Sequence, residues 1–399
     1  MPGNNDTVPL RQLSVVDDGE GVLIGNPESG VFVSVPPVGG VVVRAFARGA
    51  TLEEATVEAE RFTGQPVNLD SFVEKLRGLG FVADEDPPPI RPRRTAPIQQ
   101  RHWSDRGSGR LTRRLFGRVA WTAYTLSFFF CLGCFIVRPD LWPRPRDAFF
   151  LDNVGLSGLA LYPMVLFGMA LHEGWHWLAA RAAGVRARFG IDLRLHFLVF
   201  ETDLSQLWAL PRRNRFGPLL AGLAIDSVVL AVLLAGELVA SAVALPAVIV
   251  RLLAAAVFVR VAAITWQFLV FLRTDLYAVL VTAVGCRNLW RVKSLLLRQA
   301  FGRLNAPEEA ELARAAARDV EVGRWFRWVW LTGLVATMGW FIAFSLPVLL
   351  GILGWVADGL SPGPFTDQFW LTAAASLVLL WTPILTLIVA VRSVSMSRR

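Results

Sequence analysis

The chain is organised around the pentapeptide His172-Glu173-Gly174-Trp175-His176, which lies inside the apolar run from Tyr162 to Ala183. If this run is helical, the two histidines lie four residues apart on one face, where two imidazoles can bind one zinc ion. Glu173 would then lie beside the metal, where a carboxylate can take a proton from a water molecule. A chance match is the competing explanation, but ionisable side chains within a membrane span are costly and usually functional. The pentapeptide therefore predicts that His172 and His176 bind zinc and that Glu173 is the catalytic base.

The composition is that of a membrane protein with several spans. Of the 399 residues, 54% are hydrophobic. The first hundred residues contain no long apolar run, so we expect no signal peptide and a first span near Leu115. The net charge is +8, and every basic residue except Lys75 and Lys293 is an arginine. In a membrane protein such an excess reflects cytoplasmic loops, so we expect no nucleic-acid partner.

The N-terminal part has the pattern of a small α+β domain. Two β-rich runs, Glu20–Ile24 and Val31–Val35, are separated by turn residues, as in a hairpin. The residues from Thr51 to Glu54 match a capping box and predict a helix that ends near Gly64. A further helix is expected after Asn68, with its apolar residues on one face.

The remainder predicts a multi-pass α-helical membrane protein with about six spans. The apolar runs that predict them are Leu115–Val137, Leu156–Ala183, Phe216–Val239, the stretch from Pro246 to Cys286, Phe326–Val356 and Phe369–Val391. Arginines gather before the first run, after the second, and between the fourth and fifth. By the positive-inside rule these segments and both termini face the cytoplasm. The pentapeptide then lies in the cytoplasmic half of its span.

Between the second and third spans the hydrophobic period changes to two. Apolar residues alternate with polar ones from Phe189 to Val199, which predicts one amphipathic strand directly after the pentapeptide helix. His196 falls on the polar face and is expected to be solvated rather than a metal ligand. The open edge of such a strand could hold a peptide in an extended conformation.

These patterns divide the chain into five parts with different compositions. The parts are a small N-terminal domain (1–86), a Pro- and Arg-rich linker (87–112), a membrane core with the zinc site (113–290), cytoplasmic amphipathic helices (291–325) and a C-terminal pair of transmembrane helices (326–399).

Together, the pentapeptide within a span, the strand after it, Ala221-Gly222 near the start of the next span and the segment Leu272–Tyr277 resemble the site-2 protease family of intramembrane zinc metalloproteases. They resemble in particular its bacterial peptide zinc metalloprotease branch. The third zinc ligand of the family is the aspartate of a Leu-Asp-Gly element. The resemblance therefore implies that Asp275 is the third ligand here, with Leu276 in place of the glycine.

This resemblance implies a function and a location. The chain would be a zinc-dependent metalloendopeptidase in the bacterial inner membrane, with Zn²⁺ as its cofactor. Its substrate would be a membrane-associated or ribosomally made precursor peptide, in peptide maturation or export, and a peptide exporter would be a further partner. The competing function is that of a catalytically inactive membrane receptor or exporter partner that binds a peptide through its N-terminal domain.

The N-terminal pattern carries a second resemblance. A hairpin followed by three helices, with the segment Val38–Ala47 between them, resembles the PqqD-like winged-helix domains. This implies that a peptide is bound as an added strand at the hairpin edge. The pattern is equally that of a winged-helix module used only for packing or dimerisation.

The residues themselves also favour Asp275 over Asp226 as the third ligand. Asp226 and Arg260 are expected at similar depths in neighbouring spans, where a paired carboxylate and guanidinium can carry both charges. The stretch from Pro246 to Cys286 would be roughly 60 Å long as one helix, twice the thickness of the hydrocarbon core. It must therefore break, and its most polar point is at Arg273-Thr274-Asp275. Glu201 and Asp203 are two more carboxylates that could supply the third ligand.

Overall fold

The structure is a computed structural model that describes residues 7–17, 21–26, 31–83, 112, 114–185, 188–194 and 197–377. Its helices and strands form two compact units. One unit comprises Met1–His102, Ala183–Gly190 and Thr202–Phe216, and the other comprises the remaining residues. The predicted linker over residues 87–112 lies, except for Thr112, outside the described residues.

The sheet of the first unit has three antiparallel strands in the order of the sequence. They are β1 (Ser14–Asp17), β2 (Val22–Asn26) and β3 (Val31–Val35). The central strand β2 is buried along its whole length, and Ile24 packs in a core with Val43 and Phe81. The expected hairpin is confirmed as β2 and β3. Strand β1 was not predicted, because a run of four residues is too short to show the alternation of a strand.

Three helices complete this unit. They are α1 (Pro37–Ala47), α2 (Leu52–Thr63) and α3 (Asp70–Gly78). The predicted capping box is present, because the Thr51 hydroxyl accepts a hydrogen bond from the Glu54 N–H and the Glu54 carboxylate accepts one from the Thr51 N–H. Helix α2 ends at Gly64, whose φ of 70° favours glycine. The N-terminal part is thus a small α+β unit, as the sequence predicts.

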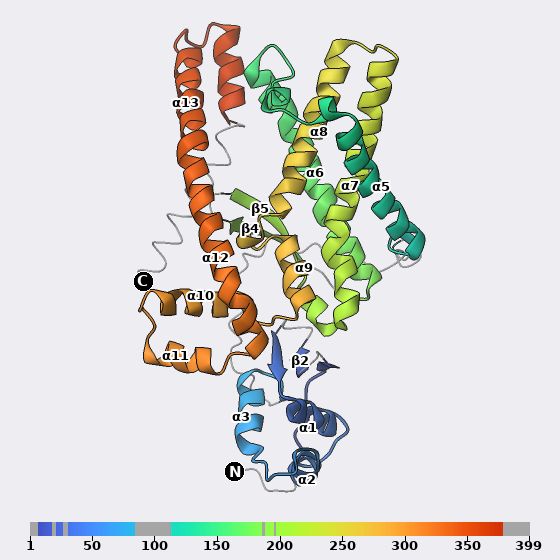
Figure 1. The fold of residues 1–399 in the computed structure, drawn as a ribbon, viewed down its shortest axis with the longest axis vertical. Coiled ribbons are helices and arrows are strands. Elements are labelled where there is room, and N and C mark those ends of the chain that lie inside the picture. Colours follow the sequence, from blue (N-terminus) through green and yellow to red (C-terminus); the bar gives the residue numbers. More distant parts are fainter. Residues whose placement is uncertain are drawn as a thin grey trace. The chain divides into compact units, whose positions relative to one another are not determined.

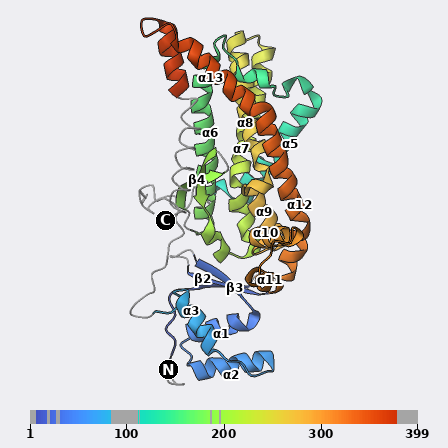
Figure 2. The same ribbon diagram turned by 90° about the vertical axis from the view of Figure 1, so that its left-hand side faces the viewer.

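The second unit is a bundle of long apolar helices (Figures 1 and 2). Its longest helices are α5 (Arg118–Val137), α6 (Val154–Ala182), α7 (Arg212–Ala242), α8 (Ala247–Gln267) and α12 (Ala317–Trp340). These five are the helices, among the described residues, that are long and apolar enough to cross a membrane. The chain is therefore a helical membrane protein with a small N-terminal α+β unit.

Helix α5 packs on α7 and α8 through one face only. Cys131 and Phe135 of α5 share an apolar cluster with Leu230 and Leu234 of α7 and Val257 of α8. Elsewhere α5 exposes large apolar side chains, among them Leu126, Phe128, Phe129, Leu132 and Ile136. Exposure of this kind along a helix of spanning length is typical of a surface that faces lipid.

The apolar stretch after Pro246 breaks where the sequence predicts. Helix α8 ends at Gln267, a short 3-10 turn covers Val270–Leu272, and α9 (Asp275–Val284) begins after it. Arg273 has a left-handed φ of 60° at the break. Asp275 is consequently the first residue of a new helix, as Figure 1 shows for α8 and α9.

The helices after α9 differ partly from the prediction. Two of the expected amphipathic helices are present, α10 (Leu289–Ala300) and α11 (Ala306–Ala313), and Asn305 and Glu308 form a capping box at the start of the second. Helix α12 begins at Ala317, before the expected start of the next span near Phe326. Its first turns carry Arg318, Asp319 and Arg324, and their polarity hid the helix start.

The end of the chain is described only in part. Helix α12 continues through a π-helical segment, Phe341–Ser345, into α13 (Leu346–Leu360). Residues 367–377 are helical, and the rest of the sixth expected span, which was predicted to end at Val391, lies outside the described residues.

The expected single strand between the second and third spans is wrong in its extent. Two strands, β4 (Arg188–Arg194) and β5 (Phe197–Asp203), pair with each other in a sheet of their own. The alternation from Phe189 to Val199 crosses the boundary between the two strands, so the period alone did not reveal where one strand ends. His196 lies outside the described residues.

The start of α12 is joined to the start of α10 by Asp319, which is 2% exposed. Its carboxylate accepts hydrogen bonds from the backbone N–H groups of Arg287 (2.9 Å) and Asn288 (3.2 Å). We predict that Asp319→Ala destabilises the protein by about 2–4 kcal/mol, because two N–H groups lose their acceptor. Thermal unfolding in detergent measures this loss. Asp358→Ala, which removes an exposed carboxylate, is the control, and an equal effect of both changes would contradict the role of Asp319.

Candidate metal centre

Helix α6 carries His172 and His176 one turn apart and faces both into the bundle. The histidines are 6% and 1% exposed, and their ring centroids lie 4.9 Å apart. Their Nε2 atoms lie 3.2 Å apart, so the same edge of each imidazole points to one place. Glu173 is the next residue on the helix and is 8% exposed. The local structure is what a helical His-x-x-x-His spacing requires.

Asp275 reaches the same place from the start of α9. Its Oδ2 atom lies 2.9 Å from Nε2 of His172 and 3.1 Å from Nε2 of His176. Ligand atoms from the three residues all lie within 4.8 Å of one another, a group that could hold a metal ion. The break between α8 and α9 is therefore what allows a carboxylate to meet the two histidines.

Gln267 and Thr274 fix the geometry of this break. The Thr274 hydroxyl donates a hydrogen bond to the Gln267 carbonyl at 2.7 Å, and the Asp275 N–H donates one to Oε1 of Gln267 at 3.2 Å. Together these bonds connect the last residue of α8 to the first residue of α9. They hold the Asp275 carboxylate toward the histidines.

The remaining nitrogen of each imidazole is bound to an acceptor. Nδ1 of His172 lies 2.7 Å from Oδ2 of Asp226, and Nδ1 of His176 lies 2.8 Å from the backbone carbonyl of Pro218. Carboxylates and carbonyls accept, so each Nδ1 carries the proton and donates it. Hydrogen bonds of this kind from metal-binding histidines orient the ring and fix its tautomer.

When both imidazoles are neutral, this assignment means that three acceptors converge on one point. With the proton on Nδ1, each neutral imidazole presents a lone pair at Nε2, and Asp275 presents a carboxylate oxygen. Three acceptors at such short distances repel one another unless a cation lies between them. Two imidazole nitrogens and one carboxylate oxygen are a donor set that binds catalytic zinc and leaves a fourth position open. The residues present therefore fit a zinc ion.

Asp226 is placed beside the centre rather than in it. Besides His172 it contacts Arg260, whose guanidinium donates to Oδ1 of Asp226 at 2.5 Å. Asp226 is 1% exposed and Arg260 5% exposed, so each neutralises the other in an apolar environment. The predicted pair of Asp226 and Arg260 is confirmed. A carboxylate occupied by both an arginine and an imidazole N–H is poorly available as a metal ligand.

Two glycines make room for this arrangement. A Cβ atom at Gly222 of α7 would collide with the rings of both His172 and His176, and a Cβ atom at Gly168 of α6 would collide with the guanidinium of Arg260. The rings can therefore lie against the backbone of α7 only because position 222 has no side chain.

Gln267 is a residue of the site that the sequence did not reveal. Its side-chain nitrogen lies 3.5 Å from Nε2 of His172, which places an amide at the edge of the candidate centre. The available signal was an amide side chain within an apolar run, eight residues before Asp275. The side chains of Glu201 and Asp203, the two carboxylates between the second and third spans, lie outside what the structure describes.

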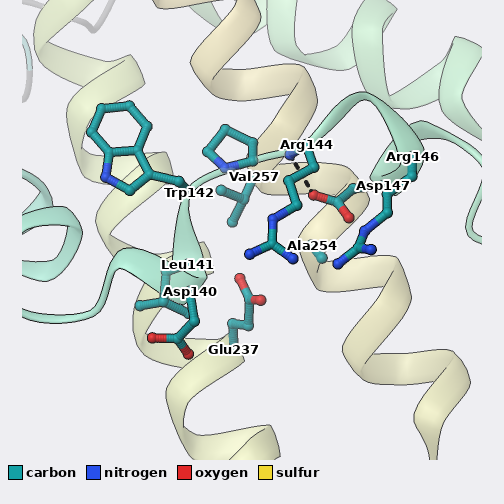
Figure 3. Close-up of a pocket in the computed structure, with 10 residues that line it drawn as sticks. Asp140, Leu141, Trp142, Arg144, Arg146, Asp147, Glu237, Ala254 and Val257 are labelled. Atoms are coloured by element: carbon teal, nitrogen blue, oxygen red, sulfur yellow. Dashed lines mark hydrogen bonds between the residues drawn. The ribbon is translucent and has the colours of Figure 1, made fainter.

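A separate polar cavity lies at the other end of α7 (Figure 3). It has a volume of about 90 Å³, and its lining includes Trp142, Arg144 and Arg146 from the connection between α5 and α6, and Glu237 from α7. Oε2 of Glu237 is buried and has no hydrogen-bond partner among the described residues. Eleven residues of helix, roughly 16 Å, separate Glu237 from Asp226, so this cavity is distinct from the candidate centre.

Comparisons of the chain with family models, with curated proteins and with solved structures find no match. The geometry of the residues therefore carries the functional argument.

The close approach at Gly222 generates a prediction. Gly222→Ala should lower the zinc affinity at least tenfold, because the added methyl group displaces the rings of His172 and His176. Zinc per mole of purified protein, measured at a fixed free zinc concentration, gives the affinity. Gly236→Ala is a matched control, because its Cβ would meet only Leu253 of α8 at 3.7 Å. Full zinc affinity in the Gly222 variant would contradict this geometry.

Replacement of Asp275 and replacement of Asp226 are predicted to affect zinc binding to different extents. Asp275→Asn should abolish stoichiometric zinc, since it replaces a proposed ligand with a weak one. Asp226→Asn should weaken zinc binding by about 10- to 100-fold, since it loosens the orientation of His172 without removing a proposed ligand. Zinc titration of both variants separates the two roles. Loss of zinc in the Asp226 variant together with full zinc in the Asp275 variant would reverse the assignment.

Proposed function

We propose that the chain is an intramembrane zinc metalloendopeptidase of the site-2 protease type. The observation that carries the proposal is the convergence of His172, His176 and Asp275 beside Glu173, within a bundle of apolar helices. A zinc ion held there would lower the pKa of a coordinated water and polarise the carbonyl of the scissile peptide bond.

Other residues of the chain transfer the proton and orient the proposed ligands. Glu173 takes a proton from the attacking water and passes it to the leaving amine. Asp226, itself held by Arg260, keeps the proton of His172 on Nδ1 and so keeps the lone pair of Nε2 directed at the centre. The burial of His172, Glu173 and His176 excludes bulk water, which strengthens each of these electrostatic interactions.

Two sheets offer edges to which an extended peptide could add as a strand. In the first unit, η3 (Ser205–Ala209) contacts β1 and β2, and β3 is the other edge of the sheet. We propose that β3 docks one segment of the precursor peptide, as in PqqD-like domains. Strands β4 and β5, which follow α6 in the chain, would present the segment to be cleaved.

The proposed location is the bacterial inner membrane. The distribution of arginine supports an orientation in which the N-terminal unit, the end of α6 that carries the pentapeptide and the C-terminus face the cytoplasm. A precursor peptide made by ribosomes would then reach the centre from the side on which it is synthesised.

Glu173→Gln distinguishes a peptidase from a peptide receptor that merely binds zinc. We predict that this variant retains stoichiometric zinc and loses cleavage by at least 100-fold, because the amide cannot accept the proton of the water. Newly formed peptide termini in the membranes of cells that produce each variant would be compared by mass spectrometry. Glu309→Gln, an exposed change on α11, is the control. An unchanged set of termini in the Glu173 variant would refute the peptidase.

Removal of residues 1–84 tests the docking role of the N-terminal unit. We predict that the shortened protein keeps its zinc, since the three proposed ligands belong to the second unit, and that it processes its natural precursor more slowly. Zinc content and the same comparison of peptide termini are the measurements. Unaltered processing would rule the docking role out, whereas loss of zinc would contradict the independence of the centre from residues 1–84.

A further inference from the structure

Lys293, one of the two lysines of the chain, lies in an aromatic cage on α10. Its side chain is only 2% exposed. Its Nζ atom lies 3.8 Å from the ring centroid of Trp290 and 3.9 Å from that of Trp330 on α12. Contacts with aromatic faces stabilise an ammonium but do not neutralise its charge. A buried lysine normally has a carboxylate partner, because an unpaired buried charge is costly.

A second cation lies against the same indole. The guanidinium carbon of Arg273 is 5.4 Å from the ring centroid of Trp290, and the Arg273 side chain is exposed. Among the residues that the structure describes, neither Arg273 nor Lys293 forms a salt bridge. Acids of the neighbouring segments are engaged elsewhere, Asp275 with the histidines, Glu308 with Arg298 and Asp319 with backbone N–H groups. Burial and the charge of Arg273 lower the pKa of Lys293 to about 8.

The surroundings of this pair of cations are those expected at the depth of lipid headgroups. Helix α12, which supplies Trp330, is long and apolar enough to span a membrane. It exposes Trp325 and Trp328 where its charged first turns meet its apolar part. Exposed tryptophans near the end of a span mark the boundary between hydrocarbon and headgroups. Basic pockets between helices at this level bind the phosphates of anionic lipids.

We propose that Arg273 and Lys293 form a binding site for the phosphate of an anionic phospholipid, with Trp290 and Trp330 as its apolar walls. The phosphate would approach from the side of the exposed Arg273 and neutralise both cations. Arg273 also stands at the break between α8 and α9, two residues before Asp275. A bound headgroup would therefore stabilise the turn that presents Asp275 to the histidines.

The test uses the full-length protein purified in a neutral detergent. Its unfolding midpoint is measured with added phosphatidylglycerol, with phosphatidylcholine and with millimolar inorganic phosphate. We expect phosphatidylglycerol alone to raise the midpoint of the natural protein, by about 3–6 °C. Lys293→Met, which keeps an unbranched side chain between the indoles, and Arg273→Gln should both lose this increment. Phospholipid phosphorus retained per mole of protein after purification is a second readout and should fall in both variants.

Arg324→Gln is the matched control, because it removes one exposed arginine of α12 without touching the cage. It should keep the full increment. Equal increments in the natural protein and in the Lys293 and Arg273 variants would overturn the site. An equal increment from inorganic phosphate would show that the site takes small anions and would overturn the assignment to a lipid. If Lys293→Met fails to fold, Arg273→Gln and the retained phosphorus decide the question.

Discussion

The arrangement of the membrane unit depends on one buried chain of polar contacts, from Arg260 through Asp226 to His172. It joins three helices, since Arg260 belongs to α8, Asp226 to α7 and His172 to α6. In an apolar environment each of these groups would be costly alone, and the paired charges of Asp226 and Arg260 offset this cost. Nε2 of His172 takes no part in these contacts and lies against His176 and Asp275.

Two glycines, which have no side chain, leave the space that these polar contacts need. Gly222 lets the backbone of α7 approach both imidazoles, and Gly168 leaves space for the guanidinium of Arg260. Small residues at helix contacts are a general means of close packing in membranes. Here they have a second effect, because they let polar groups of neighbouring helices come within hydrogen-bonding distance. The glycines that let α6, α7 and α8 pack closely therefore also set the geometry of the centre.

The sequence predicts a feature correctly where only one structure is compatible with the residue pattern. The four-residue spacing of His172 and His176 has one meaning on a helix, and an apolar stretch twice the thickness of a membrane must break. The prediction was wrong where two different structures are compatible with the same pattern. Alternation from Phe189 to Val199 crosses the boundary between β4 and β5, so one strand was expected in place of two. The approach of Gln267 to His172 depends on the path of the break, and no local pattern encodes it.

The central claim is that two imidazoles and one carboxylate bind a single zinc ion inside the bundle. X-ray absorption at the zinc edge of the purified protein tests it most directly. We expect two nitrogen ligands and at least one oxygen ligand at about 2.0–2.2 Å, with no sulfur ligand. Protein that contains no zinc under zinc-replete conditions, or zinc bound through sulfur at about 2.3 Å, would contradict it.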